Sequence, residues 1–147
     1  MKTVTIEELE QVHDKNFCVI DIRPAEQYSR GTFPGAVNIP ADRLEDQLER
    51  LFEKEPSGQL VELTENVTEA GKTRVLKNMT IYVLCHTGER SRSCVELLEE
   101  AGYDGVNIEG GYRAYLKLSL SRYMEKESEE KRKEKRGEEL SYLYKMN

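Results

Sequence analysis

Cys85 opens a short loop whose residue types could carry out nucleophilic chemistry. The loop Cys85-His86-Thr87-Gly88-Glu89-Arg90 follows an apolar, β-rich run and precedes a segment with helical periodicity. A loop that leaves a strand and enters a helix turns backbone N–H groups toward its centre, and the helix dipole adds positive partial charge there. We therefore expect Cys85 to lie in a field that stabilises its thiolate, the reactive form of cysteine.

The residues after Cys85 suit the binding of an anion. Gly88 allows either a positive φ angle or a close approach of the backbone. Arg90 and Arg92 place formal positive charge at the start of the following helix, where the helix dipole disfavours it. A basic group placed against this local preference indicates that an anion is bound there, with Arg90 as the candidate that holds it.

Other reactive side chains favour structural roles. Cys18 lies in an apolar strand and Cys94 on the apolar face of a helix, so both are predicted in the core, although either could act as a resolving thiol. The three cysteines match no zinc-site spacing, and no metal site is predicted. Asp21 and Arg23 end a buried strand, where a salt bridge that supports the loop is favoured over a catalytic pair.

Apolar patterns predict the elements that position these residues. Strands are expected at 17–22, 36–40, 80–84 and 106–108, and helices at 6–12, 25–28, 42–53, around 94–101 and from Tyr112 onward. Thr5 and Glu8 have the spacing of a capping box, and Gly102 stands where a left-handed helix cap is expected. Because strands and helices alternate with short connections, the sequence predicts an α/β fold with a largely parallel central sheet and helices on both faces.

Length and composition favour one globular domain with a charged extension. The 147 residues predict a domain over 1–120, with an excursion at 55–78 that has no clear periodicity, and a helical or disordered tail over 121–147. The tail ends in the apolar cluster Leu140-Ser141-Tyr142-Leu143-Tyr144, which could pack back on the domain or form a dimer. A net charge of −6 argues against nucleic-acid binding, and no signal peptide or membrane span is predicted, so the expected location is the cytoplasm.

Four ordered motifs resemble those of rhodanese-like sulfurtransferases. The segment 81–91 is similar to the active-site segment of that family, and Asp21-Ile22-Arg23-Pro24 begins a stretch similar to its amino-terminal signature. The turn at 31–40 and the closing pattern at 97–112 follow in the family's order. The resemblance covers roughly residues 3 to 117, and it implies a single-domain rhodanese-like fold.

The resemblance also implies a reaction and its participants. The Cys85 thiolate would attack the outer sulfur of a donor such as thiosulfate, release sulfite and carry the sulfur as a persulfide. Backbone N–H groups from His86, Thr87, Gly88, Glu89 and Arg90 would stabilise the anion, and these five residues form the expected substrate-binding set. A thiol or a protein would then accept the sulfur, and no cofactor is needed.

The sequence departs from the family pattern at two places, and it allows two alternative functions. Thr32 stands where the family usually has histidine, and 55–78 is longer than the usual connection, which concerns the choice of substrate or partner. A non-catalytic docking module is one alternative. A cysteine-dependent phosphatase or arsenate reductase is less favoured, because such enzymes need arginine six positions after the cysteine, and that position is Ser91 here.

Overall fold

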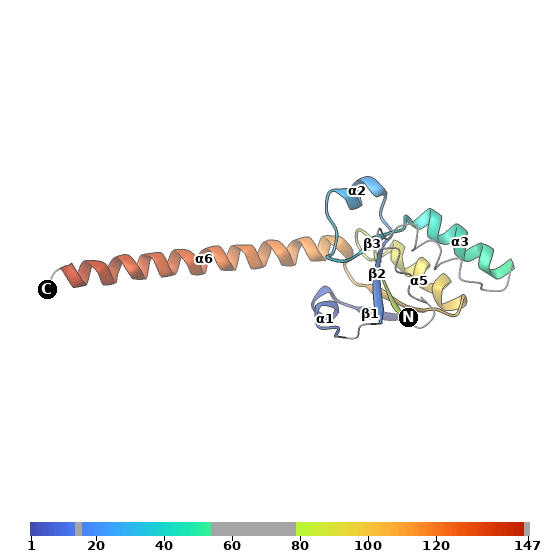
Figure 1. The fold of residues 1–147 in the computed structure, drawn as a ribbon, viewed down its shortest axis with the longest axis horizontal. Coiled ribbons are helices and arrows are strands. Elements are labelled where there is room, and N and C mark those ends of the chain that lie inside the picture. Colours follow the sequence, from blue (N-terminus) through green and yellow to red (C-terminus); the bar gives the residue numbers. More distant parts are fainter. Residues whose placement is uncertain (14–15, 54–78, 146–147) are drawn as a thin grey trace. The chain divides into compact units, whose positions relative to one another are not determined.

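A computed structural model describes residues 1–13, 16–53 and 79–145 of the chain, so the predicted excursion at 55–78 lies outside the described residues. The chain divides into two compact units, Met1–Tyr115 and Leu116–Asn147. The strands are β1 (Lys2–Val4), β2 (Phe17–Asp21), β3 (Val37–Asn38), β4 (Thr80–Leu84) and β5 (Asp104–Ile108). The helices are α1 (Ile6–Glu10), α2 (Ala25–Ser29), α3 (Ala41–Glu53), α5 (Arg90–Glu100) and α6 (Gly111–Lys145) (Figure 1).

The five strands form one parallel sheet in the order β1-β5-β4-β2-β3, as the alternating pattern predicted. The chain leaves β4 through α5 toward β5 and leaves β2 in the opposite direction toward β3. The boundary between β2 and β4 is therefore the topological switch point, where open parallel sheets bind ligands at the carboxyl ends of their strands. Cys85 follows β4 at this edge, and Ile22-Arg23 follows β2.

Strand β1 was not predicted from the sequence. Its three residues are exposed or half-buried, and they pair with β5 at the register Lys2 to Val106. Lys2 Nζ also donates to Asp104 Oδ1 at 2.6 Å. A strand this short carries no alternation, so only its pairing with a distant segment identifies it.

Local signals at the helix ends are confirmed at two predicted positions. Thr5 and Glu8 form the reciprocal capping box at the start of α1. Gly102 has a φ of +86° directly after the C-cap of α5, in the left-handed region that glycine tolerates. Helix α1 ends at Glu10, two residues before the predicted end, and β3 covers only two of the five predicted residues.

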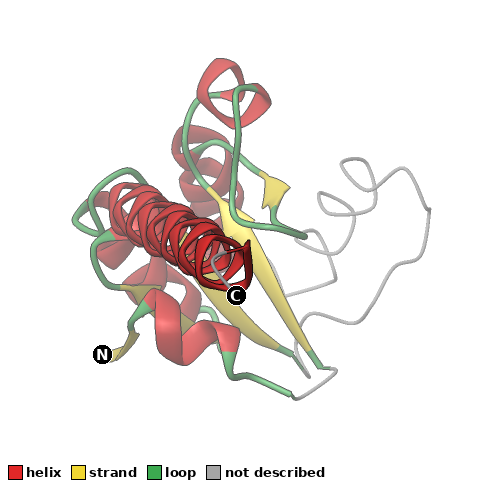
Figure 2. Ribbon diagram, turned by 90° about the vertical axis from the view of Figure 1, so that its left-hand side faces the viewer, coloured by secondary structure: helices red, strands yellow, loops and turns green. Residues whose placement is uncertain are grey.

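The core lies between the sheet and the helices α3 and α5. Alternate residues of the central strands, among them Ile20, Ile81 and Val83, pack there with Leu44 of α3 and Leu98 of α5. Helix α1 lies on the other face of the sheet (Figure 1), and its side chains Ile6 and Leu9 are buried. Figure 2 shows the strands between these layers. The helices on both faces confirm the predicted layering.

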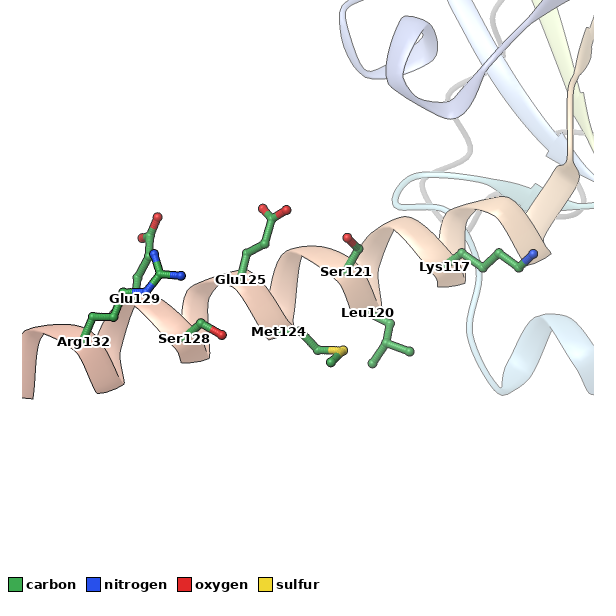
Figure 3. A pocket seen from close by; sticks show the side chains of 8 residues that line it. All are labelled: Lys117, Leu120, Ser121, Met124, Glu125, Ser128, Glu129 and Arg132. Atoms are coloured by element: carbon green, nitrogen blue, oxygen red, sulfur yellow. The ribbon is translucent and has the colours of Figure 1, made fainter.

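The second unit consists of the helix α6 after Tyr115. It contains the charged run 125–139, which is helical here, and its apolar side chains at 116, 120, 123, 124, 140 and 143 are exposed. Figure 3 shows eight side chains of this helix that border a surface hollow, from Lys117 to Arg132. Among the helices of the described residues, none combines the length and apolarity that crossing a membrane requires.

Candidate functional site

Cys85 follows the carboxyl end of β4 and begins the loop that leads to α5. Its side chain is buried, and the Gly88 N–H donates to Cys85 Sγ at 2.9 Å. Gly88 has a φ of +89°, and a Cβ atom at this position would lie 2.8 Å from the Gly110 nitrogen. The loop therefore needs glycine here to direct an N–H group at the sulfur.

A buried hydrogen-bond chain connects the sulfur to strand β5. The Cys85 thiol donates to Ser91 Oγ at 3.2 Å, and the Ser91 hydroxyl donates to Asn107 Oδ1. Asn107 Nδ2 in turn donates to the Gly88 carbonyl at 3.2 Å, which closes the chain on the loop itself. Because a hydroxyl can rotate to donate to either neighbour, Ser91 can hydrogen-bond the sulfur in both its thiol and thiolate forms.

A buried ion pair at the end of β2 forms the neighbouring wall. Arg23 Nη2 lies 2.7 Å from Asp21 Oδ2, and Arg23 Nε donates to Asp21 Oδ1 at 3.0 Å. Arg23 Nη2 also donates to the Gly31 carbonyl at 2.7 Å. Thr32 Oγ1 donates to Asp21 Oδ2 at 2.7 Å, so the residue that departs from the family pattern belongs to this network. The pair holds the loop after β2 in place.

The first turn of α6 fixes the base of the loop. Tyr112 N–H donates to the Cys85 carbonyl at 2.8 Å, and Arg113 N–H donates to the His86 carbonyl at 3.0 Å. A side chain at Gly111 would collide with both of these carbonyl oxygens. The Arg23 guanidinium lies 3.9 Å from the centre of the Tyr112 ring, so this turn also joins the loops after β2 and β4.

A pocket of about 350 Å³ opens beside Cys85 at the switch point between β2 and β4. Cys85, His86 and Arg90 border it from the loop, Arg23 from the end of β2, and Asp42 from the start of α3. The full lining also includes Ile22, Pro24, Gln27, Pro40 and Ala41. The pocket therefore brings the Cys85 thiol together with basic groups and with the apolar side chains of Ile22, Pro24, Pro40 and Ala41.

The other two cysteines are held in unreactive protonation states. Burial raises the pKa of the Cys18 thiol to about 12. Burial and then the nearby Glu45 carboxylate raise the pKa of the Cys94 thiol to about 12 as well. Cys94 belongs to the core cluster and Cys18 packs against it. At neutral pH both sulfurs stay protonated, which leaves Cys85 as the cysteine that faces a pocket.

The five predicted loop residues, 86–90, contribute to the Cys85 pocket in different ways. His86 and Arg90 border the pocket, Gly88 contributes its N–H group, and the side chains of Thr87 and Glu89 are exposed. Arg90 is engaged elsewhere, because its Nη2 donates to Asp42 Oδ1 at 2.6 Å. Within the described residues, no group of three or more His, Cys, Asp or Glu side chains is placed to hold a metal ion.

Sequence reasoning missed Ser91 and Asn107 as parts of the site. The signal for Asn107 was present, since it is a polar residue between the apolar Val106 and Ile108 near the end of β5. A buried amide requires hydrogen-bond partners, and this requirement points to a neighbour on another element. Ser91 stands six positions after Cys85 and is fully buried.

Ser91→Ala is expected to slow the reaction of Cys85 by about ten- to a hundred-fold, the range for losing a hydrogen bond to a charged group. The variant also leaves the buried Asn107 oxygen without its donor. Ser93→Ala is the matched control, because Ser93 is exposed and its hydroxyl donates only to the Arg90 carbonyl at 2.9 Å. The rate of Cys85 alkylation by iodoacetamide measures the effect, and equal rates in both variants would contradict it.

Comparisons with known proteins agree with this geometry. The rhodanese-like domain family matches residues 5–118. The chain is 31% identical over 99 residues to the human thiosulfate:glutathione sulfurtransferase, which covers 67% of this chain and 77% of that protein. It is 32% identical over 94 residues to the thiosulfate sulfurtransferase PspE of Escherichia coli, covering 64% of this chain and 69% of PspE. The human single-domain sulfurtransferase TSTD1 superposes with a TM-score of 0.61 at 25% identity, over 80% of this chain and 96% of that one.

Other relatives are much longer than this chain. It matches 22% of the adenylyltransferase and sulfurtransferase UBA4 of Meyerozyma guilliermondii and 19% of MOCS3 of Arabidopsis thaliana, at 27% and 30% identity over 74% and 66% of this chain. The relatives of comparable length are sulfurtransferases, which supports a sulfur-transfer role at the level of the family. The matched span of 5–118, the parallel sheet and the cysteine loop together show that the chain belongs to the rhodanese-like domain family.

Proposed function

We propose that this protein transfers sulfane sulfur through a persulfide on Cys85. The observation that carries the proposal is the Cys85 sulfur itself, which accepts the Gly88 N–H at 2.9 Å and borders a pocket. A thiolate at this position attacks the outer sulfur of thiosulfate, and the S–S bond of the donor breaks. Sulfite leaves with the bonding electrons, and Cys85 becomes a persulfide anion.

The surroundings of the sulfur support a covalent intermediate that carries negative charge. The Gly88 N–H and the Ser91 hydroxyl are both within hydrogen-bond distance of Cys85 Sγ. The Gly88 N–H already points at the sulfur and stabilises charge that develops there without having to reorient. The Ser91 hydroxyl adds a second hydrogen bond once it rotates from Asn107 to the sulfur. His86 at the pocket wall and Arg90 at the start of α5 are the proposed contacts for the anionic donor.

A thiol or a protein is the proposed acceptor of the sulfur. The human relative is a thiosulfate:glutathione sulfurtransferase, and YrkF of Bacillus subtilis, a putative sulfur carrier protein, is 26% identical to this chain. The acceptor thiolate attacks the outer sulfur of the Cys85 persulfide, and the Cys85 thiolate leaves. A pocket of about 350 Å³ leaves room beside the sulfur for a group larger than thiosulfate.

The phosphatase alternative has less support. The position six residues after Cys85 is occupied by the buried Ser91 hydroxyl rather than by arginine. A short, uncharged hydroxyl therefore lies next to the sulfur where that chemistry would need a cation for phosphate. Incubation with p-nitrophenyl phosphate is expected to release no nitrophenol above the rate of a Cys85→Ser variant.

Intact-mass measurement tests the proposed persulfide directly. The protein treated with thiosulfate and desalted is expected to gain the mass of one sulfur atom and to lose it when cyanide or a thiol is added. Peptide mapping should place the added sulfur on Cys85, because Cys18 and Cys94 have pKa values of about 12. If no sulfane donor adds this mass, the protein is a binding module rather than a carrier.

A further inference from the structure

Helix α3 brings carboxylates to the mouth of the Cys85 pocket. Asp42 is in the first turn of α3 and borders the pocket. Arg90 Nη2 donates to Asp42 Oδ1 at 2.6 Å and lies 3.8 Å from Glu45 Oε2. The cation proposed to contact the sulfur donor is therefore already shared between two carboxylates of the neighbouring helix.

The ion pairs lower the positive charge that the pocket offers to an anion. Of the charged residues that border it, Arg23 is paired with the buried Asp21, and Arg90 is paired with Asp42. Each pair is formally neutral, so a donor with two negative charges gains little net attraction there. A donor with one negative charge is less affected by the carboxylate, because its Coulomb energy with Asp42 is half as large.

We propose that Asp42 is a specificity-determining residue that acts through Arg90 and disfavours doubly charged sulfur donors relative to singly charged ones. The proposal rests on the proposed sulfur transfer at Cys85. By holding the Arg90 guanidinium, Asp42 both occupies its donor group and adds negative charge at the pocket mouth. The site then accepts organic sulfane sulfur, which carries one negative charge or none, with less competition from inorganic dianions.

Two donors of nearly the same shape separate charge from size. Thiosulfate carries two negative charges, and methanethiosulfonate replaces one of its oxygen atoms by a methyl group and carries one. With either donor the Cys85 thiolate forms a bond to the outer sulfur. The leaving group, sulfite or methanesulfinate, takes the electrons of the broken S–S bond. The two reactions give the same persulfide, so they differ only in recognition and leaving group.

The experiment compares kcat/KM for both donors, with cyanide as acceptor at low ionic strength, in the wild type and in Asp42→Asn. The side chains of Arg90 and Asp42 are 56% and 92% exposed, so the effect is modest. We expect the ratio of thiosulfate to methanethiosulfonate to rise by about two- to five-fold in Asp42→Asn, the range for an exposed ion pair. The increase should shrink at high salt, because exposed charges are screened.

Two further variants provide a charge control and test whether the effect of Asp42 depends on Arg90. Glu100→Gln removes the same charge from the exposed last residue of α5 and should leave the donor ratio unchanged. In an Arg90→Gln background, Asp42→Asn should raise the ratio by less than in the wild type, because only the charge of the carboxylate itself is then removed and no guanidinium is released. If Asp42→Asn changes both donors equally, or acts as strongly without Arg90, the inference is wrong. If the wild type transfers sulfur from neither donor, the proposed function fails and the inference fails with it.

Discussion

Replacing Cys85 by serine is expected to abolish sulfur transfer while the fold is retained. The serine oxygen is a poor nucleophile toward sulfur and forms no persulfide, so turnover should fall by at least about a thousand-fold, as for other enzymes that lose their nucleophile. A serine hydroxyl can keep the hydrogen bonds that the cysteine makes with the Gly88 N–H and the Ser91 hydroxyl. The measurement is thiosulfate-dependent formation of thiocyanate from cyanide.

Cys18→Ala is the matched control for this variant. It also removes one thiol, but Cys18 is a partly buried strand residue that packs against the core. Transfer should continue in this variant at a rate close to that of the wild type. Persistence of thiosulfate-dependent transfer in Cys85→Ser would show that another group carries the sulfur. A thermal melt of each variant separates loss of chemistry from loss of fold.

Replacing Asp21 by asparagine is expected to cost the largest amount of stability of any single change considered. Asp21 is fully buried and accepts hydrogen bonds from the backbone and side chain of Arg23 and from Thr32. Removal of one partner from a buried ion pair leaves the other charge uncompensated, which costs about 3–5 kcal/mol. We expect the free energy of unfolding in urea to fall by this amount.

The exposed pair between Lys2 and Asp104 provides the comparison. The side chain of Lys2 is 68% exposed, and its Nζ lies 2.6 Å from Asp104 Oδ1. Lys2→Ala should leave the urea midpoint close to that of the wild type, because solvent screens this pair. A loss in Asp21→Asn no larger than in Lys2→Ala would contradict the structural role of the buried pair.

A second substitution tests whether the uncompensated charge is the cause. In the double variant Asp21→Asn, Arg23→Met, the buried cation is gone, and the unfolding free energy should recover part of the loss. Recovery will be incomplete, because Arg23 also contacts the Gly31 carbonyl and the Tyr112 ring. If the double variant is less stable than Asp21→Asn alone, the arginine stabilises the fold mainly through those other contacts.

The amino-acid sequence alone determined the class of fold and the candidate for the reactive residue. A capping box, a left-handed glycine and short apolar runs act over a few residues, so they predict α1, the end of α5 and the strands β2 and β4. Cys85 could be identified for the same reason, because the strand, the loop and the helix that position it are consecutive. The order of the four motifs, which resembles that of rhodanese-like sulfurtransferases, then indicated sulfur transfer as the reaction.

Only the tertiary structure decided how the loop is supported and what its arginine contacts. Asn107 is 16 positions from Ser91, and Arg90 is 48 positions from Asp42, so no local periodicity relates them. Their proximity follows from the packing of α5 on β5 and on α3. The short strand β1 likewise depends on pairing with β5 near the other end of the unit. The sequence therefore determined where Cys85 lies, between a strand and a helix, whereas packing decided that Ser91 bonds its sulfur and that Arg90 pairs with a carboxylate.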